Sequence, residues 1–319
     1  MTLPVVRVDA LMGNRNEDAF RQEAERLGEA CARWGFVRLQ GLPRDLNLDR
    51  MLDDVRSFFS LDENIKHRLA TRHFRADSLN RYRGFFPAEP GEHALKEGFE
   101  LGWSDFEPTD SLDFLQESNV WPDVQPYDGW QSSVSLYFDQ MLEVGQVLLD
   151  GLETYFGLTP GRLTRHFNNS LSTLRMAYYP AIDGRTNTGK LERDGDQVFT
   201  TPTHTDSGIL TLLLQDRTGG LQVRNRQGEW MEVEPEPDTL IMNIGALLEQ
   251  WTGHQLVATE HRVRAPDRSR YSVPFFLEPA PNAEVAPLTD KADFTPFLYE
   301  QYLKRKLSQF VEYQGLAGA

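Results

Sequence analysis

Cysteine is nearly absent from this 319-residue chain, in which Cys31 stands alone. A single cysteine cannot form an internal disulfide, and its position in an apolar helical stripe predicts a buried thiol rather than a reactive one. No apolar run approaches the roughly 20 residues that a membrane span requires. Residues 1–11 lack a basic region followed by an apolar core, so we expect no signal peptide and a cytoplasmic protein.

Basic charge is also scarce. The chain has 33 lysines and arginines against 48 acidic residues, which gives a net charge of −15 and a pI near 4.9. Binding to phosphate backbones requires clustered basic residues, so we expect neither nucleic acid nor an anionic membrane as a partner. Linkers rich in proline, glycine and serine are absent too, which favours one domain over residues 1–319.

Short, closely spaced strands dominate the second half of the chain. This spacing predicts a mainly β protein with flanking helices, built on a double-sheet jelly-roll core over about residues 170–280. The predicted strands cover residues 174–179, 204–215, 221–225, 230–233, 239–243, 257–263 and 270–277. Apolar stripes at helical spacing predict helices over residues 16–34, 48–59, 130–156 and 294–310. Residues 1–125 form an N-terminal helical and strand region, and residues 281–319 contribute the C-terminal helix.

The stretch Thr203-His204-Thr205-Asp206 contains the first candidate metal ligands. If it is extended, His204 and Asp206 project to the same side, a few ångströms apart. An imidazole and a carboxylate are two of the three ligands in the triad of two histidines and one carboxylate that holds non-haem Fe(II). Taken alone, such a pair is a weak signal and more often belongs to a surface strand, so a second histidine is needed.

Two later histidines could supply that ligand. His254 follows a glycine in a predicted turn, whereas His261 lies on the predicted strand 257–263 and shares its inward face with valine and threonine side chains. This alternation favours His261 as the third ligand. The alternative is an ordinary hydrogen-bonded histidine of the core.

Arg270 and Ser272 share one face of the predicted strand 270–277. An arginine between inward apolar residues is costly to bury without an anion, and a guanidinium beside a hydroxyl is a good receptor for a carboxylate. The alternative is an internal ion pair.

These residues occur in the order found in one enzyme family. Other motifs that share the likeness are Pro4-Val5-Val6-Arg7-Val8-Asp9, Ala30-Cys31-Ala32-Arg33-Trp34-Gly35-Phe36, Lys96-Glu97-Gly98-Phe99-Glu100, Gly219-Gly220-Leu221-Gln222-Val223, Asn243-Ile244-Gly245 and His261-Arg262-Val263. Nearly the whole chain thus resembles the Fe(II)/2-oxoglutarate-dependent dioxygenases of the isopenicillin N synthase-like family.

The resemblance implies Fe(II) as cofactor, bound by His204, Asp206 and His261, with 2-oxoglutarate and O2 as cosubstrates. It further implies that Arg270 and Ser272 hold the distal carboxylate of 2-oxoglutarate together with Tyr179, which precedes a proline as in the family. The implied reaction oxidises a C–H bond of a small molecule and forms succinate and CO2.

The substrate is predicted from the stretch Arg81-Tyr82-Arg83-Gly84-Phe85-Phe86, which matches the place where relatives direct a loop over the iron. An acidic protein must place cations locally to bind an anion. Arg81 and Arg83, with Phe85 and Phe86, therefore predict a small substrate that carries an anionic group. Alternatively, both arginines lie on a solvated loop or pair with nearby glutamates.

The family pattern is not complete, because Ala177 and Ala246 stand where many relatives have a polar and an acidic residue. Neither position is a metal ligand, so the departures bear on the substrate. Three other functions remain open: an Fe(II) oxidase or cyclase of the isopenicillin N synthase type that does not consume 2-oxoglutarate, a non-catalytic binding protein, and a zinc hydrolase. Zinc sites of that kind more often use other ligand sets and spacings.

Overall fold

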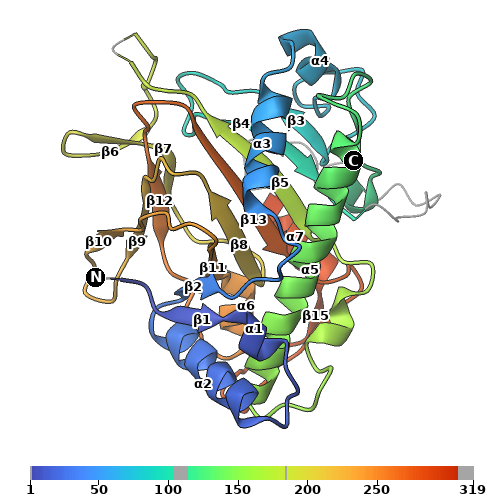
Figure 1. The fold of residues 1–319 in the computed structure, drawn as a ribbon, viewed down its shortest axis with the longest axis vertical. Coiled ribbons are helices and arrows are strands. Elements are labelled where there is room, and N and C mark those ends of the chain that lie inside the picture. Colours follow the sequence, from blue (N-terminus) through green and yellow to red (C-terminus); the bar gives the residue numbers. More distant parts are fainter. Residues whose placement is uncertain (1, 104–113, 184, 308–319) are drawn as a thin grey trace.

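A computed structural model describes residues 2–103, 114–183 and 185–307. Two sheets form its centre (Figure 1). The larger sheet contains, in spatial order, β1 (Val5–Arg7), β2 (Phe36–Gln40), β11 (Leu240–Ile244), β8 (Leu210–Gln215), β13 (Arg270–Leu277), β5 (Thr173–Tyr179), β4 (Glu97–Leu101) and β3 (Gly84–Phe86). The smaller sheet contains β10 (Trp230–Glu232), β9 (Leu221–Arg224), β12 (His261–Arg264), β7 (Gln197–His204) and β6 (Glu192–Asp194). A separate pair joins β14 (Glu284–Val285) to β15 (Phe297–Leu298).

Strands from distant parts of the chain share the larger sheet. The N-terminal strand β2 pairs with β11, and β4 pairs with β5, so the N-terminal region extends the core sheet on both sides. The predicted mainly β class with flanking helices is confirmed, and the two sheets form the predicted jelly-roll core.

Helices α2 (Asp18–Arg33), α3 (Leu48–Phe59) and α5 (Trp130–Tyr155) pack on the larger sheet on the side away from the smaller sheet (Figure 1). The other helices are α1 (Val8–Leu11), α4 (Glu63–Arg68), α6 (Ala246–Trp251) and α7 (Tyr299–Leu307), with short 3-10 turns at Phe114–Gln116 and Thr164–Phe167. The ring of Phe138 on α5 lies 5.1 Å from that of Phe275 on β13, which anchors the helix to the sheet. A Cβ at Gly28 would come within 2.1 Å of Tyr155, so this close approach of α2 to α5 requires glycine.

The main helices were predicted well because each has a continuous apolar face. Helix α3 has the predicted bounds, and the Asn47 side chain caps it by accepting a hydrogen bond from Arg50 N at 2.9 Å. Helix α2 stops before Gly35, whose φ of +64° suits glycine. Cys31 is buried on its inner face, as predicted.

The predicted strand 204–215 was wrong, since it is interrupted after His204 and resumes at Leu210. Residues between them turn toward α6, where Asp206 O accepts the N–H of Ala246 at 2.8 Å. The turn thereby satisfies an amide at the start of α6 that has no partner within that helix.

Strand 257–263 was also predicted too long, because β12 begins only at His261. The preceding residues bind the end of α2 instead: Val257 N donates to Cys31 O at 3.3 Å, and Thr259 Oγ1 donates to Trp34 O at 2.7 Å. Of the predicted helix 294–310, residues 299–307 are helical, Phe297–Leu298 is a strand, and 308–310 lie outside the described residues. Among the described helices, none is long and apolar enough to cross a membrane.

Candidate metal centre and cosubstrate site

The strand pairing of the smaller sheet brings two histidines together. His204 ends β7, His261 begins β12, and the two are direct cross-strand partners with ring centroids 4.2 Å apart. Asp206, in the turn after β7, places Oδ1 3.7 Å from Nε2 of each histidine. These three residues form a metal-binding triad, in which one ligand atom from each lies within 4.8 Å of the others. The alternative ligand, His254, is a largely exposed turn residue at φ +59° and lies outside the triad.

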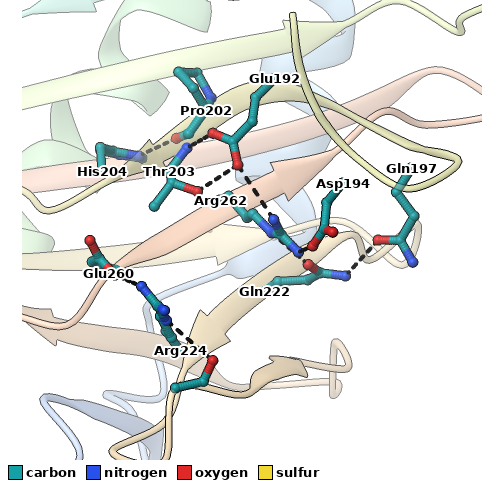
Figure 2. Close-up of polar contacts among 11 residues, drawn as sticks. Glu192, Asp194, Gln197, Pro202, Thr203, His204, Gln222, Arg224, Glu260 and Arg262 are labelled. Atoms are coloured by element: carbon teal, nitrogen blue, oxygen red, sulfur yellow. Dashed lines mark hydrogen bonds and ion pairs between the residues drawn. The ribbon is translucent and has the colours of Figure 1, made fainter.

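Both histidines are held in the tautomer that suits a metal. His204 Nδ1 lies 2.9 Å from Pro202 O (Figure 2), and His261 Nδ1 lies 3.2 Å from Thr259 O. A carbonyl oxygen can only accept, so each Nδ1 carries the proton. The lone pair of each Nε2 is then available for coordination.

Asp206 is oriented in the same way. Its Oδ2 accepts hydrogen bonds from Thr211 Oγ1 at 2.5 Å and from Asn243 Nδ2 at 2.7 Å. This leaves Oδ1 directed at the two histidines. The Asn243-Ile244-Gly245 motif thus contributes an amide that fixes the carboxylate ligand.

The electrostatics favour the charge states that a divalent cation requires. Enclosure in the site, reinforced by His261, lowers the pKa of His204 to about 4, so its imidazole is neutral at pH 7. Burial acts to raise the pKa of Asp206, but the adjacent histidines outweigh it and hold that pKa below its usual value. Two imidazole nitrogens and one carboxylate oxygen directed at a shared point are the donor set of a facial triad, which suits Fe(II).

A second cross-strand pair lies in the larger sheet. Arg270 on β13 faces Tyr179 on β5, and its guanidinium carbon lies 4.7 Å from the centroid of the tyrosine ring. Arg270 Nε donates to Gly219 O at 2.7 Å, whereas Nη1 is buried and has no hydrogen-bond partner among the described residues. Ser272, two residues along β13, is buried as well.

Two buried hydrogen-bond donors near this pair have no protein partner within the residues that the structure describes and are available to an anion. Besides Arg270 Nη1, the buried hydroxyl of Thr201 has no partner in the described part of the chain. Burial would raise the pKa of Tyr179, yet the positive charges of Lys96 and Arg270 lower it to about 8. Because unpaired buried donors are costly, this arrangement fits the distal carboxylate of 2-oxoglutarate.

A cavity of about 390 Å³ opens beside the metal triad and is bordered by His204 and Asp206. Aromatic side chains from the N-terminal region, Phe276 of β13, and Leu303 and Leu307 of α7 contribute apolar walls. Its charged lining residues include Lys96, Glu100, Arg175 and Glu278. This is the volume of a site for a small molecule.

Of the four residues predicted to contact substrate, only Phe86 lines this cavity. Phe85 is fully buried and packs near Phe58, with ring centroids 6.4 Å apart. Arg83 is fully buried and donates to Thr173 Oγ1 and, at 3.1 Å, to Leu171 O.

The loop backbone explains these positions. Glu117 accepts hydrogen bonds from the backbone N–H groups of Arg81, Tyr82 and Arg83, at 2.7 to 3.2 Å. This contact fixes the conformation of the segment, and Arg81 lies outside the cavity lining. Anion binding by Arg81 and Arg83 was predicted from alternation along an extended segment, but only 84–86 form a strand here.

Sequence analysis missed the charged residues that do line the cavity, although alternation could have found several of them. Thr173 and Arg175 stand on the face of β5 that Tyr179 occupies, and Glu278 continues the face of Arg270, Ser272 and Phe276 beyond β13. Lys96 likewise precedes β4 and continues the face of Gly98 and Glu100.

Comparisons with known proteins agree with this geometry. The model of the 2OG-Fe(II) oxygenase superfamily matches residues 170–279, and the model described as "non-haem dioxygenase in morphine synthesis N-terminal" matches residues 3–124. A 2-oxoglutarate-dependent dioxygenase of Glarea lozoyensis is 30% identical over 297 residues, which cover 84% of this chain and 85% of that protein.

Solved structures share the fold. A full-length Neurospora crassa protein in complex with alpha-KG superimposes with a TM-score of 0.82 at 21% identity, covering 97% of this chain and 96% of that one. A 2OG-Fe(II) oxygenase family protein of Caulobacter crescentus is 27% identical with a TM-score of 0.77, covering 96% and 98%.

The chain therefore belongs to the 2OG-Fe(II) oxygenase superfamily. It is an Fe(II)- and 2-oxoglutarate-dependent dioxygenase that acts on a small molecule, as the resemblance implied. The findings support this function and not the alternative of an oxidase that dispenses with 2-oxoglutarate.

Proposed function

We propose that Arg270, Ser272 and Tyr179 hold the distal carboxylate of 2-oxoglutarate, and that the cavity beside the triad takes a small anionic substrate. The observation that carries the first part is the buried, unpaired Nη1 of Arg270, directed by the bond from Nε to Gly219 O. When bound, Fe(II) with 2-oxoglutarate supplies the chemistry, in which O2 is consumed, succinate and CO2 form, and a C–H bond of the substrate is oxidised.

The chain's own residues provide orientation and enclosure for this reaction. His204, His261 and Asp206 would hold the metal, because the backbone and Asn243 fix each ligand atom. The cavity borders His204 and Asp206, and its aromatic and leucine walls would limit water near the reacting groups.

Binding of 2-oxoglutarate is tested without a substrate. The anaerobic Fe(II) protein should develop a visible charge-transfer band on addition of 2-oxoglutarate. Arg270→Ala should require a much higher concentration to produce the band. A band that forms equally well in this variant would overturn the assignment of Arg270.

The anionic substrate is proposed from Lys96. This lysine is half-buried in the cavity lining, and its ammonium has no hydrogen-bond or ion-pair partner among the described residues. The other lining cation, Arg175, lies 2.5 Å from Glu100, which offsets its charge. Burial also raises the pKa of Glu278 to about 7, which reduces the negative charge of this wall. A cation without an ion-pair partner inside a cavity favours an anionic ligand next to it.

We therefore assign to Lys96, supported by Arg175, the anion-binding role that was predicted for Arg81 and Arg83. Lys96→Met should reduce the preference for carboxylic acids over their neutral amides in a substrate panel by about tenfold, the value of one lost charge-assisted contact. Lys190→Met is a matched control, since Lys190 is exposed and already pairs with Glu92 at 2.7 Å. Loss of 2-oxoglutarate affinity with unchanged acid preference would place Lys96 at the cosubstrate instead.

We further propose that residues 1–319 act as one dioxygenase domain, because N-terminal strands pair with both flanks of the core sheet. A cytoplasmic location is proposed from the single cysteine, which suits a reducing compartment. Fractionation of cells that express the chain tests this location.

A further inference from the structure

The strand pair that holds the two iron-binding histidines is irregular at the site. Between Thr201 and His204, β7 contains one residue more than β12 does between Val263 and His261, which is a β-bulge. A bulge disrupts the ladder of backbone hydrogen bonds, so the spacing of the two histidines needs support from elsewhere.

Glu192 on the edge strand β6 provides contacts at this bulge (Figure 2). Its carboxylate accepts the backbone N–H of Thr203 at 2.6 Å and the Thr203 hydroxyl at 2.7 Å. The same carboxylate accepts Arg262 Nη1 at 3.4 Å. Thr203 directly precedes His204, and Arg262 directly follows His261. One carboxylate therefore joins the neighbours of both histidine ligands.

Arg262 is itself held on every side. Its side chain is only 5% exposed, and the guanidinium carbon lies 3.8 Å from the ring centroid of Phe199 and 4.0 Å from that of Trp230. Nε donates to Gln222 Oε1 at 2.8 Å and Nη2 to Asp194 Oδ2 at 2.8 Å, as Figure 2 shows. A guanidinium fixed between two rings and by three polar partners is a rigid support.

We propose that Glu192 and Arg262, together called the Glu192–Arg262 clamp, are positioning residues for the metal centre. The clamp fixes the distance and orientation of His204 relative to His261 where the bulge weakens the ladder, and it contacts neither the metal nor the substrate. Residues that orient metal ligands typically change metal affinity by about 10- to 100-fold when they are removed. The clamp acts through the backbone, so the lower end of this range is expected.

The chain offers a matched control on the other side of His261. Glu260 directly precedes this histidine and pairs with Arg224 at 2.7 Å, also drawn in Figure 2. Both side chains of this pair are nearly half exposed, at 46% and 45%. A solvent-exposed ion pair contributes little to local order, so its loss should leave the metal centre unchanged.

The test measures Co(II) affinity by competition with a chelator, the Co(II) absorption spectrum, and the Tm of the metal-free protein. Glu192→Ala should weaken Co(II) binding about tenfold and alter the spectrum, whereas Glu260→Ala should do neither. Glu192→Gln removes the charge but keeps an oxygen acceptor, so it should retain most of the affinity.

The outcomes separate positioning from an effect of charge and from a general loss of stability. If Glu192→Gln loses as much affinity as Glu192→Ala, long-range charge accounts for the effect and the clamp is rejected. Wild-type affinity and spectrum in Glu192→Ala would reject it as well. If Glu192→Ala lowers the Tm strongly, the variant Thr203→Val provides the test instead, because it removes only the hydrogen bond from the Thr203 hydroxyl. This variant should shift the Co(II) spectrum in the same direction as Glu192→Ala, but by less. An unchanged Co(II) spectrum in Thr203→Val rejects the clamp.

Discussion

Two cross-strand pairs, one in each sheet, carry two histidines of the metal triad and the proposed receptor for 2-oxoglutarate. His204 and His261 pair in the smaller sheet, where each Nδ1 has a carbonyl partner. Tyr179 and Arg270 pair in the larger sheet, where Arg270 Nη1 is buried without a partner in the described part of the chain. The protein alone orients the metal ligands, whereas the proposed 2-oxoglutarate site retains donors that a ligand must satisfy.

The largest effect is expected from breaking the histidine pair. His261→Ala removes one of three ligands of the triad, so tight Fe(II) binding and turnover should be lost while the fold remains. Anaerobic Fe(II) titration measures iron binding, and circular dichroism measures whether the fold remains. His254→Ala, which changes an exposed turn residue, should bind iron normally. Full iron occupancy and turnover in His261→Ala would contradict the triad.

Breaking the pair of Tyr179 and Arg270 should weaken 2-oxoglutarate binding and leave metal binding unchanged. Arg270→Ala should weaken 2-oxoglutarate binding by about 30- to 1000-fold, because a charge-assisted contact to a carboxylate contributes about 2–4 kcal/mol. Calorimetric titration of the Mn(II) protein with 2-oxoglutarate measures this loss, and Mn(II) affinity in the absence of 2-oxoglutarate should stay as in the wild type. If Arg270→Ala lost affinity for both 2-oxoglutarate and Mn(II), the two cross-strand pairs would not act independently.

A pH-dependent effect on stability should arise beside the metal triad, at Glu278. Burial raises the pKa of Glu278 to about 7, from an ordinary value near 4.5, while Tyr299 O–H donates to Oε2 at 2.5 Å. Between these two values the folded state binds more protons than the unfolded state, so stability falls as pH rises and is greatest below the lower value. The shift corresponds to at most about 3 kcal/mol.

Glu278→Gln should remove this part of the pH dependence, since the amide cannot ionise but still accepts from Tyr299. Urea unfolding of both metal-free proteins at pH 5 and pH 8 provides the measurement. The wild type should lose more free energy of unfolding over this interval than the variant does. Equal losses in both proteins would show that Glu278 does not titrate in this range.

The smallest effect should come from removing a hydrogen bond that orients Asp206 while all three metal ligands remain. Asn243→Ala deletes one of the two hydrogen bonds to Asp206 Oδ2 and leaves that from Thr211. Iron affinity should fall about tenfold, as is typical for a lost partner of a metal ligand. Chelator competition with Fe(II) measures the change, and Asn243→Asp, which cannot donate when ionised, should weaken binding at least as much. Unchanged affinity in both variants would mean that Thr211 alone orients the carboxylate.

The order of motifs along the chain, through the family resemblance that it carries, predicted the metal triad of His204, Asp206 and His261. Each of these residues taken alone was compatible with a structural role. Apolar periodicity likewise predicted α3 with its observed bounds, because the inward face of a helix recurs at a fixed spacing. The assumed geometry was less accurate, since Asp206 reaches the site from a turn that binds α6, not from a continuous strand.

Only the tertiary structure decided that Lys96, and not Arg83, faces the cavity. Arg83 and Lys96 are both cations near aromatic residues in sequence, yet Arg83 is buried among backbone carbonyls while Lys96 lines the cavity. The difference depends on Glu117, which binds the backbone of 81–83 from more than thirty residues away. Sequence therefore determined the ligands and the periodic elements, whose signals are local. Long-range contacts determined the substrate side, because a side chain's exposure depends on partners that are distant in the chain.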